Sequence, residues 1–125
     1  MIVDSSAVVA IALLEPGYEV LVDLISADGR AGIGGPTLAE TGIVLSAKLG
    51  VRGRTLLVRL LEEAELDVVP FGEEHWLVAV EAFSQYVKGH HPGGLNFGDC
   101  LTYATARLAD EPLLVLGDAF AQTDL

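Results

Sequence analysis

The sequence predicts a single α/β domain, residues 1–125, in which helices cover both faces of a mostly parallel central sheet. Two observations carry this prediction. The runs at residues 1–3 and 113–116 are continuously apolar, as strands buried on both faces are. Segments with apolar residues at helical spacing alternate with strands along the chain, which is typical of three-layer α/β/α architectures. A chain of 125 residues is long enough to bury such a core without disulfides.

Up to residue 70, the expected elements are a strand at 1–3, helices over 7–14 and about 17–27, a weak strand at 30–34, helices over 35–50 and 52–65, and a strand at 66–70. Pro16 separates the first two helices, which are expected to form a hairpin. The Gly-Pro-Thr sequence at 35–37 favours a helix start, and Gly50 favours the end of that helix.

Beyond residue 70, the expected elements are a helix over 73–88, the loop GHHPGG at 89–94, a helix over 96–108 and a strand at 113–116. The helix over 73–88 is amphipathic, and its apolar side carries Trp76, Leu77, Val80, Phe83 and Val87.

Composition excludes several classes of protein. Seven basic and 18 acidic residues give a net charge of −11, which argues against a nonspecific DNA-coating protein or a binder of anionic membranes and favours a cation or a basic partner. A hydrophobic content of 51% suggests that some apolar surface meets a partner. The single Cys100, together with apolar runs too short to span a bilayer, predicts a cytoplasmic protein.

Four acidic residues are expected to converge at one edge of the sheet. Asp4 and Asp118 directly follow buried strands, and Glu40 and Asp99 lie near helix starts. Asp4 has two alternative roles at this stage, as a cap of the following helix or as a ligand. Four clustered carboxylates would repel one another unless a cation or a basic group neutralised them.

Carboxylate oxygens without a Cys or paired-His set suit Mg²⁺ or Mn²⁺ and not zinc. Such an ion activates water for in-line attack on phosphorus. The pattern therefore indicates phosphodiester hydrolysis.

Four blocks of the chain resemble, in order and spacing, those of PIN-domain ribonucleases, especially VapC-type toxins: MIVDSSAVVAIALLE, PTLAETGIVL, LNFGDCLTYATARLA and LLVLGDAFAQTD. The resemblance implies a PIN-like α/β/α sandwich in which Asp4, Glu40 and Asp99 take the acidic metal-site positions. Ser6 takes the hydroxyl position that supports the first acid. Many relatives carry a fourth acid where this chain has Ala119. Asp118 is expected to substitute for it, and Asp124 is a further candidate.

The resemblance further implies an endoribonuclease that depends on Mg²⁺ or Mn²⁺, the toxin of a type II toxin–antitoxin pair. It would act on RNA as a homodimer, without contact with a membrane, and a VapB-type antitoxin would block its acidic site. An alternative is a catalytically weakened PIN fold that only binds, because of Ala119. A receiver-like phosphoacceptor module is less favoured, because IVDSS offers one acid and VLGDAF no Lys. A haloacid-dehalogenase-type phosphatase would need a second Asp where Ser6 stands.

Other conspicuous side chains have simpler interpretations. His90 and His91 are assigned to loop structure or RNA contact and not to metal binding. Cys100, Trp76 and Tyr103 are expected in the core. Four of the seven basic residues fall in one short stretch, which is either a phosphate-facing surface or a solvated helical face: Lys48, Arg52, Arg54 and Arg59.

Overall fold

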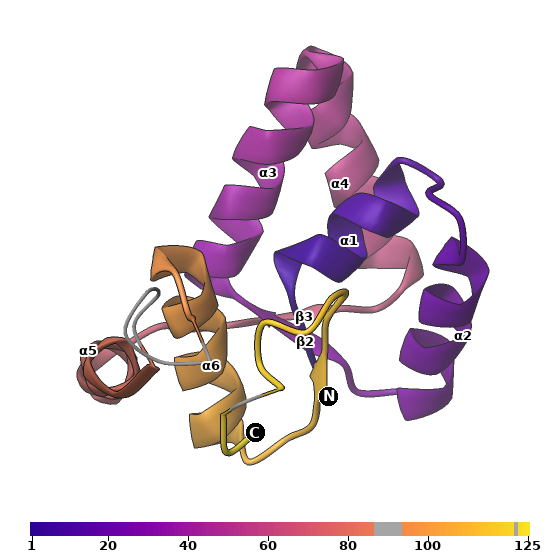
Figure 1. Ribbon diagram of the computed structural model, residues 1–125. Coiled ribbons are helices and arrows are strands. Elements are labelled where there is room, and N and C mark those ends of the chain that lie inside the picture. Colours follow the sequence, from indigo (N-terminus) through magenta and orange to yellow (C-terminus); the bar gives the residue numbers. More distant parts are fainter. Residues whose placement is uncertain (87–93, 122) are drawn as a thin grey trace.

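A computed structural model describes residues 1–86, 94–121 and 123–125 of the chain. Within this part, four parallel strands form one sheet in the order β3-β2-β1-β4. The strands are β1 (Ile2–Val3), β2 (Gly32–Gly34), β3 (Asp67–Val69) and β4 (Leu113–Leu114). Helices flank this sheet (Figure 1), so the expected α/β/α architecture is confirmed.

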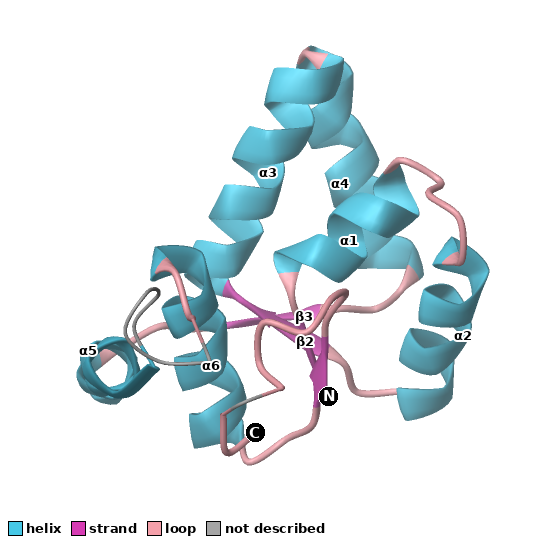
Figure 2. Cartoon of the chain, viewed as in Figure 1, coloured by secondary structure: helices cyan, strands magenta, loops and turns pink. Residues whose placement is uncertain are grey.

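The helices of the described chain are α1 (Ser5–Ala12), α2 (Tyr18–Asp28), α3 (Gly35–Leu49), α4 (Val51–Glu63), α5 (Glu73–Tyr86) and α6 (Phe97–Ala109). Figure 2 shows how short the strands are relative to the helices. Most boundaries lie within two residues of those that the sequence predicts. Residues 87–93, which include most of the predicted GHHPGG loop, lie outside the described residues. No helix in the described ranges is both long and apolar enough to cross a bilayer.

The sheet separates two apolar clusters. Consecutive side chains of a strand point to opposite faces, and β4 follows this rule. Leu114 packs with the cluster formed by α1, α2, α3 and α4, whereas Leu113 and Val115 pack with the cluster formed by α5 and α6. Burial on both faces explains why β1 and β4 read as continuously apolar runs.

Helix α5 corrects one prediction from sequence. Its buried positions are Ala79, Ala82 and Tyr86. The larger apolar side chains that were expected to pack inward are about half exposed instead: Trp76, Leu77, Val80 and Phe83. Small residues let α5 approach α6 closely, and the large ones lie at the margin of this contact or outside it. Trp76 is therefore not a core residue, and Val87 lies outside the described residues.

Helices α3 and α4 form a hairpin that projects from the sheet (Figure 1). Gly53 on α4 makes the close approach of the two helices possible. A Cβ atom at this position would collide with the carbonyl oxygen of Leu45 on α3, so only glycine fits. Gly53 thus lets α3 and α4 pack closely near the turn that joins them.

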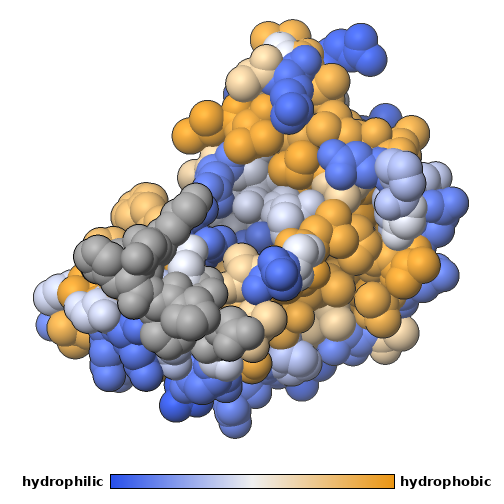
Figure 3. All heavy atoms as spheres, in the orientation of Figure 1, coloured by the Kyte–Doolittle hydropathy of each residue, from blue (hydrophilic) through white to orange (hydrophobic). Residues whose placement is uncertain are grey.

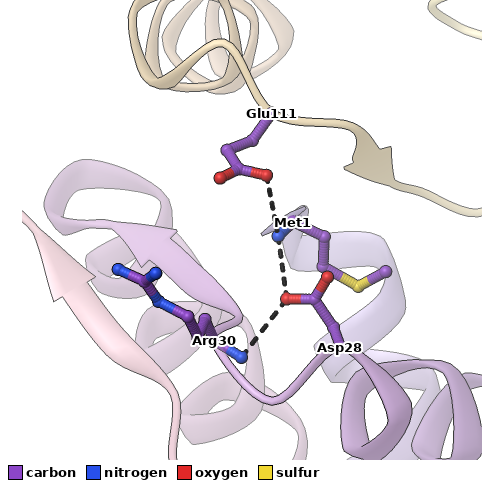
Figure 4. A network of polar contacts seen from close by, with 4 residues as sticks. All are labelled: Met1, Asp28, Arg30 and Glu111. Carbon is purple, nitrogen blue, oxygen red and sulfur yellow. Dashed lines mark hydrogen bonds and ion pairs between the residues drawn. The ribbon is translucent and has the colours of Figure 1, made fainter.

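The start of β1 is fixed by an exposed polar network (Figure 4). The ammonium group of Met1 lies 3.0 Å from Asp28 Oδ2 and 3.4 Å from Glu111 Oε2, and the amide of Arg30 donates to the same Asp28 oxygen at 3.3 Å. These contacts join the ends of α2 and α6 to the strand that leads into Asp4.

Candidate active site

Asp4 directly follows β1 and is 6% exposed. Its backbone amide donates to the carbonyl oxygen of Leu114 at 2.9 Å, which continues the pairing of β1 with β4. The amide of Ser6 donates to Asp4 Oδ2 at 3.1 Å, so Asp4 caps helix α1. The capping role considered from sequence is therefore confirmed, and it occupies only one of the two carboxylate oxygens.

The second oxygen of Asp4 is bound by helix α6. Thr102 Oγ1 donates to Asp4 Oδ1 at 2.7 Å, and Thr102 is 1% exposed. Thr102 lies one turn beyond Asp99 on the same side of α6. An ionised carboxylate has about four acceptor positions, and these two hydrogen bonds use two of them. Asp4 thus retains acceptor capacity beside the first turns of α6.

Asp99 belongs to the capping box at the start of α6. The amide of Asp99 donates to Asn96 Oδ1 at 2.9 Å, and the amide of Asn96 donates to Asp99 Oδ2 at 3.1 Å. The carboxylate also lies in the positive end of the helix dipole. Asp99 is thereby held in a fixed orientation at the helix start.

Glu40 approaches this same helix start from α3. Its side chain is exposed, yet its carboxylate lies directly against Gly98, the residue before Asp99. A Cβ atom on Gly98 would stand 2.7 Å from Glu40 Oε2. The absence of a side chain at position 98 therefore gives Glu40 its place beside α6.

Ser6 connects this region to the segment after β4. Ser6 Oγ accepts a hydrogen bond from the amide of Leu116 at 3.0 Å. Asp118 follows two residues later, after Gly117 with its left-handed φ of 86°, and is exposed. Ala119 is half-buried and packs against the α5–α6 cluster. Position 118 is therefore the more exposed of the two positions considered for a fourth acid.

Asp124 is engaged elsewhere along α6. The hydroxyl of Tyr103 donates to Asp124 Oδ1 at 2.5 Å, and Arg107 Nη2 lies 3.7 Å from Asp124 Oδ2. Burial of Tyr103, reinforced by this hydrogen bond to a carboxylate, raises the pKa of the phenol. Tyr103 is buried, as the sequence predicts.

The donor chemistry of this region fits a hard divalent cation, because carboxylate and hydroxyl oxygens are the ligands that such ions prefer. Among residues 1–86, 94–121 and 123–125, no three Asp, Glu, His or Cys side chains are grouped closely enough to hold a metal ion. For Asp4, Glu40 and Asp99 to bind one ion together, at least one of these side chains must therefore rotate. Glu40, which is exposed and has three rotatable bonds, is able to make this movement.

Of the other side chains that the sequence singles out, Cys100 lies in the described part of the chain. Cys100 is buried, and that burial, with the neighbouring charge of Asp99 as a second cause, raises the pKa of its thiol. It is therefore a protonated core residue at neutral pH. His90 and His91 lie outside the described residues.

The basic stretch lies on the α3–α4 hairpin. Lys48 is in the last turn of α3, and Arg52, Arg54 and Arg59 are on α4, all with exposed side chains. Arg54 and Arg59 line a groove of about 660 Å³ at the hairpin. Arg59 Nη2 also lies 3.7 Å from Glu63 Oε1 on the same helix. Glu40 and Lys48 both belong to α3, so this helix links the acidic region to the basic stretch.

Figure 3 shows a hollow between α3, α1 and α6, with a largely hydrophilic and neutral floor and hydrophobic residues on the side of α1. Three residues that the sequence did not single out contact the candidate acids or their partners: Thr37, Gly98 and Thr102. The available signal was spacing, because Thr37 and Thr102 each stand three residues from a candidate acid on the same helix.

Comparisons with known proteins agree with this architecture. The PIN domain family profile matches residues 1–125. Ribonuclease VapC36 of Mycobacterium tuberculosis is 47% identical over 126 residues, which cover 100% of this chain and 91% of that protein. Ribonuclease VapC of Mycolicibacterium smegmatis is 36% identical over 125 residues, which cover 100% of this chain and 97% of that protein.

Among solved structures, the crystal structure of Mycobacterium tuberculosis VapC20, described as a Sarcin-Ricin loop cleaving toxin, matches with a TM-score of 0.76. The match covers 96% of this chain and 92% of that chain at 18% sequence identity, so it supports the fold alone. The family profile and the curated relatives span the full length of the chain. The chain therefore belongs to the PIN-domain family and, within it, to the VapC-type ribonucleases.

Proposed function

We propose that this protein is an endoribonuclease that depends on Mg²⁺ or Mn²⁺ and hydrolyses RNA phosphodiester bonds. One observation carries the proposal: Asp4 and Glu40 both contact the first turns of α6, where Asp99 is held by its capping box. Three elements far apart in sequence thus bring carboxylates to one helix start. The names of the curated relatives, which are ribonucleases, support the same reaction.

In this proposal Asp4, Glu40 and Asp99 bind the cation, and Asp118 supports it from the segment that Ser6 binds. A divalent ion held there would supply Lewis-acid activation of water and of a phosphate oxygen. The protein contributes by holding the carboxylates in fixed orientations. Asp4 is fixed by its two hydrogen bonds and Asp99 by its capping box, so neither side chain must be ordered when substrate arrives.

The proposal includes partners. The naming of the relatives as VapC proteins supports a toxin role in the cytoplasm with a VapB-type antitoxin. Exposed apolar side chains on α5 and α6 support contact with a protein, either a second copy in a homodimer or the antitoxin. Phe83 and Phe97 are 52% and 78% exposed and line an apolar groove of about 200 Å³.

The test is cleavage of a pool of structured RNA by the purified protein with Mg²⁺ or Mn²⁺ and, separately, with EDTA. Asp99→Asn keeps one oxygen that can accept from the Asn96 amide, and it removes the charge and replaces the other oxygen with an NH2 group. Cleavage is expected to fall to the EDTA level in Asp99→Asn and Asp4→Asn. Asp23→Asn, a substitution of the same type at an exposed position of α2, is the matched control and is expected to cut as the wild type does.

Asp4→Asn needs a stability measurement beside the activity assay. The amide nitrogen of an Asn cannot accept a hydrogen bond, so one of the two bonds to Asp4 is lost, at a cost of about 1–3 kcal/mol in a buried site. Thermal unfolding shows whether the variant is still folded at the assay temperature. Cleavage that survives both substitutions would refute the assignment of the acids, and RNA binding without cleavage by the wild type would favour the weakened, binding-only alternative.

A further inference from the structure

Two buried threonines join the elements that carry the candidate carboxylates. Thr102 on α6 donates from Oγ1 to Asp4 Oδ1 at 2.7 Å, and Thr37 on α3 lies 3.1 Å from Thr102, Oγ1 to Oγ1. The two threonines are 1% and 2% exposed. Burial removes each hydroxyl from contact with water. This desolvation costs free energy, and only these hydrogen bonds offset it.

The number of protons fixes the direction of the network. A hydroxyl has one proton to donate, and Thr102 donates its proton to Asp4. Thr37 therefore supplies the proton of the bond between the two hydroxyls. The network runs from Thr37 through Thr102 to Asp4, and each bond polarises the next in the same direction. Its acceptor end is a carboxylate proposed to bind the cation.

The spacing of the threonines relates them to the other two acids. Thr37 and Glu40 are three residues apart on α3, and Asp99 and Thr102 are three residues apart on α6. Residues three apart lie on the same side of a helix. The bond between Thr37 and Thr102 therefore holds the Glu40 side of α3 against the Asp99 side of α6. The bond from Thr102 to Asp4 holds the end of β1 against α6.

We propose that Thr102, supported by Thr37, is a positioning residue that sets the arrangement of Asp4, Glu40 and Asp99 for a divalent cation. This inference rests on the proposed function. Thr102 acts through Asp4 and does not itself touch substrate. It fixes the rotation of the Asp4 carboxylate, so that the acceptor positions left on both oxygens keep one direction. Hydroxyls that orient metal-binding carboxylates typically change metal affinity about 10- to 100-fold when removed.

The test compares a variant without the hydroxyl with one that retains it. Thr102→Val removes the hydroxyl at nearly constant volume, and Thr102→Ser keeps the hydroxyl and removes the methyl group. Thr105→Val is the matched control, because Thr105 is equally buried on the same helix but donates to the carbonyl oxygen of Leu101 within that helix, at 3.0 Å. Mn²⁺ affinity is measured by calorimetric titration of the purified full chain without RNA. RNA cleavage then gives kcat and KM separately.

Thr102→Val is expected to bind Mn²⁺ about 10- to 100-fold more weakly and to lower kcat while KM for RNA is retained. Thr102→Ser is expected to restore both values, and Thr105→Val to match the wild type. Equal Mn²⁺ affinity and kcat in Thr102→Val and Thr105→Val would overturn the inference and leave the proposed function standing. A folded wild type that neither binds Mn²⁺ nor cuts RNA would overturn the proposed function and the inference with it.

Thermal unfolding without metal controls for loss of structure. If Thr102→Val does not fold, Thr37→Val takes its place. This variant leaves the bond from Thr102 to Asp4 intact and removes only the hydroxyl behind it. It is expected to weaken Mn²⁺ binding severalfold relative to Thr105→Val. Equal affinity in these two variants would overturn the inference.

Discussion

The carboxylate of Glu40 packs against the backbone of Gly98, one residue before Asp99. A Cβ atom at position 98 would lie 2.7 Å from Glu40 Oε2 and 3.1 Å from Oε1. Real Cβ atoms essentially never make a contact of 2.7 Å, so any residue other than glycine must displace the Glu40 carboxylate. A substitution at position 98 can therefore change activity without lowering stability.

Gly98→Ala is expected to lower RNA cleavage, because the added methyl group restricts the positions open to the Glu40 carboxylate beside Asp99, while the protein stays at least as stable as the wild type. The atoms that must move are the end of an exposed, flexible side chain, and an Ala within a helix is favoured over Gly by about 0.5–1 kcal/mol. Cleavage rate and thermal unfolding of the same preparation check this. Gly42→Ala on α3 is the control, since a Cβ atom at position 42 would lie an ordinary 3.5 Å from its nearest neighbour, Leu57 Cδ2. Full activity in Gly98→Ala would refute the placement of Glu40.

Substitutions of Asp118 and of Asp124 are expected to have opposite effects on RNA cleavage and on stability. Asp118→Asn should weaken Mn²⁺ binding and cleavage without changing the melting temperature, because Asp118 is exposed. Asp124→Asn should retain cleavage and lower stability, because Asp124 binds Tyr103 and Arg107. The carboxamide keeps one oxygen for the Tyr103 hydroxyl, so the loss of charge on this hydrogen bond and of one exposed ion pair predicts a cost of about 1 kcal/mol. Calorimetry and a cleavage assay on both variants distinguish the two roles, and the reverse pattern would assign the fourth acid to Asp124.

The groove that Arg54 and Arg59 line at the α3–α4 hairpin is expected to bind RNA phosphates through these two side chains. Arg54→Ala and Arg59→Ala should each raise KM for RNA and leave kcat unchanged. Each should also reduce by about one the slope of log affinity against log salt concentration. Arg30→Ala, which removes a positive charge next to Asp28 at the end of α2, is the control. Unchanged salt dependence in both hairpin variants would mean that this face is only a solvated helical surface.

The Met1–Asp28 contact predicts a pH-dependent contribution to stability. The hydrogen bond from the Met1 ammonium is the largest cause that holds the pKa of Asp28 below its ordinary value of 3.8. A lowered pKa means that the charged form is favoured in the folded state. The contribution is therefore fully present above the ordinary pKa and is lost as the pH falls through the lowered pKa.

Asp28→Asn should accordingly melt below the wild type at about pH 7, and the difference should shrink as the pH is lowered toward about 3. Melting curves of both proteins over this range measure the effect. High salt should also reduce it, because the pair is exposed. A difference that is constant with pH would show that Asp28 acts only through its hydrogen bond to the Arg30 amide.

Sequence pattern was most informative where one local rule governs the structure. Continuous hydrophobicity identifies β1 and β4, because burial on both faces excludes polar residues. Glycine and proline signals place the limits of α3 within about a residue. The prediction was wrong at α5, because helical periodicity identifies the apolar side of a helix but not whether that side packs against the core. The contact with α6 uses the small residues Ala79 and Ala82, so Trp76 and Phe83 remain exposed.

The sequence alone determined the fold class, the strand and helix order and the candidate acids, because periodicity, turn residues and residue type are local properties. Only the tertiary structure decided which groups meet. The Thr102–Asp4 bond joins residues 98 positions apart, and the Thr37–Thr102 contact joins residues 65 positions apart. The approach of Glu40 to Gly98 likewise depends on how α3 packs against α6. Such pairings arise from the register of the sheet and the packing of helices on it, which no local pattern specifies.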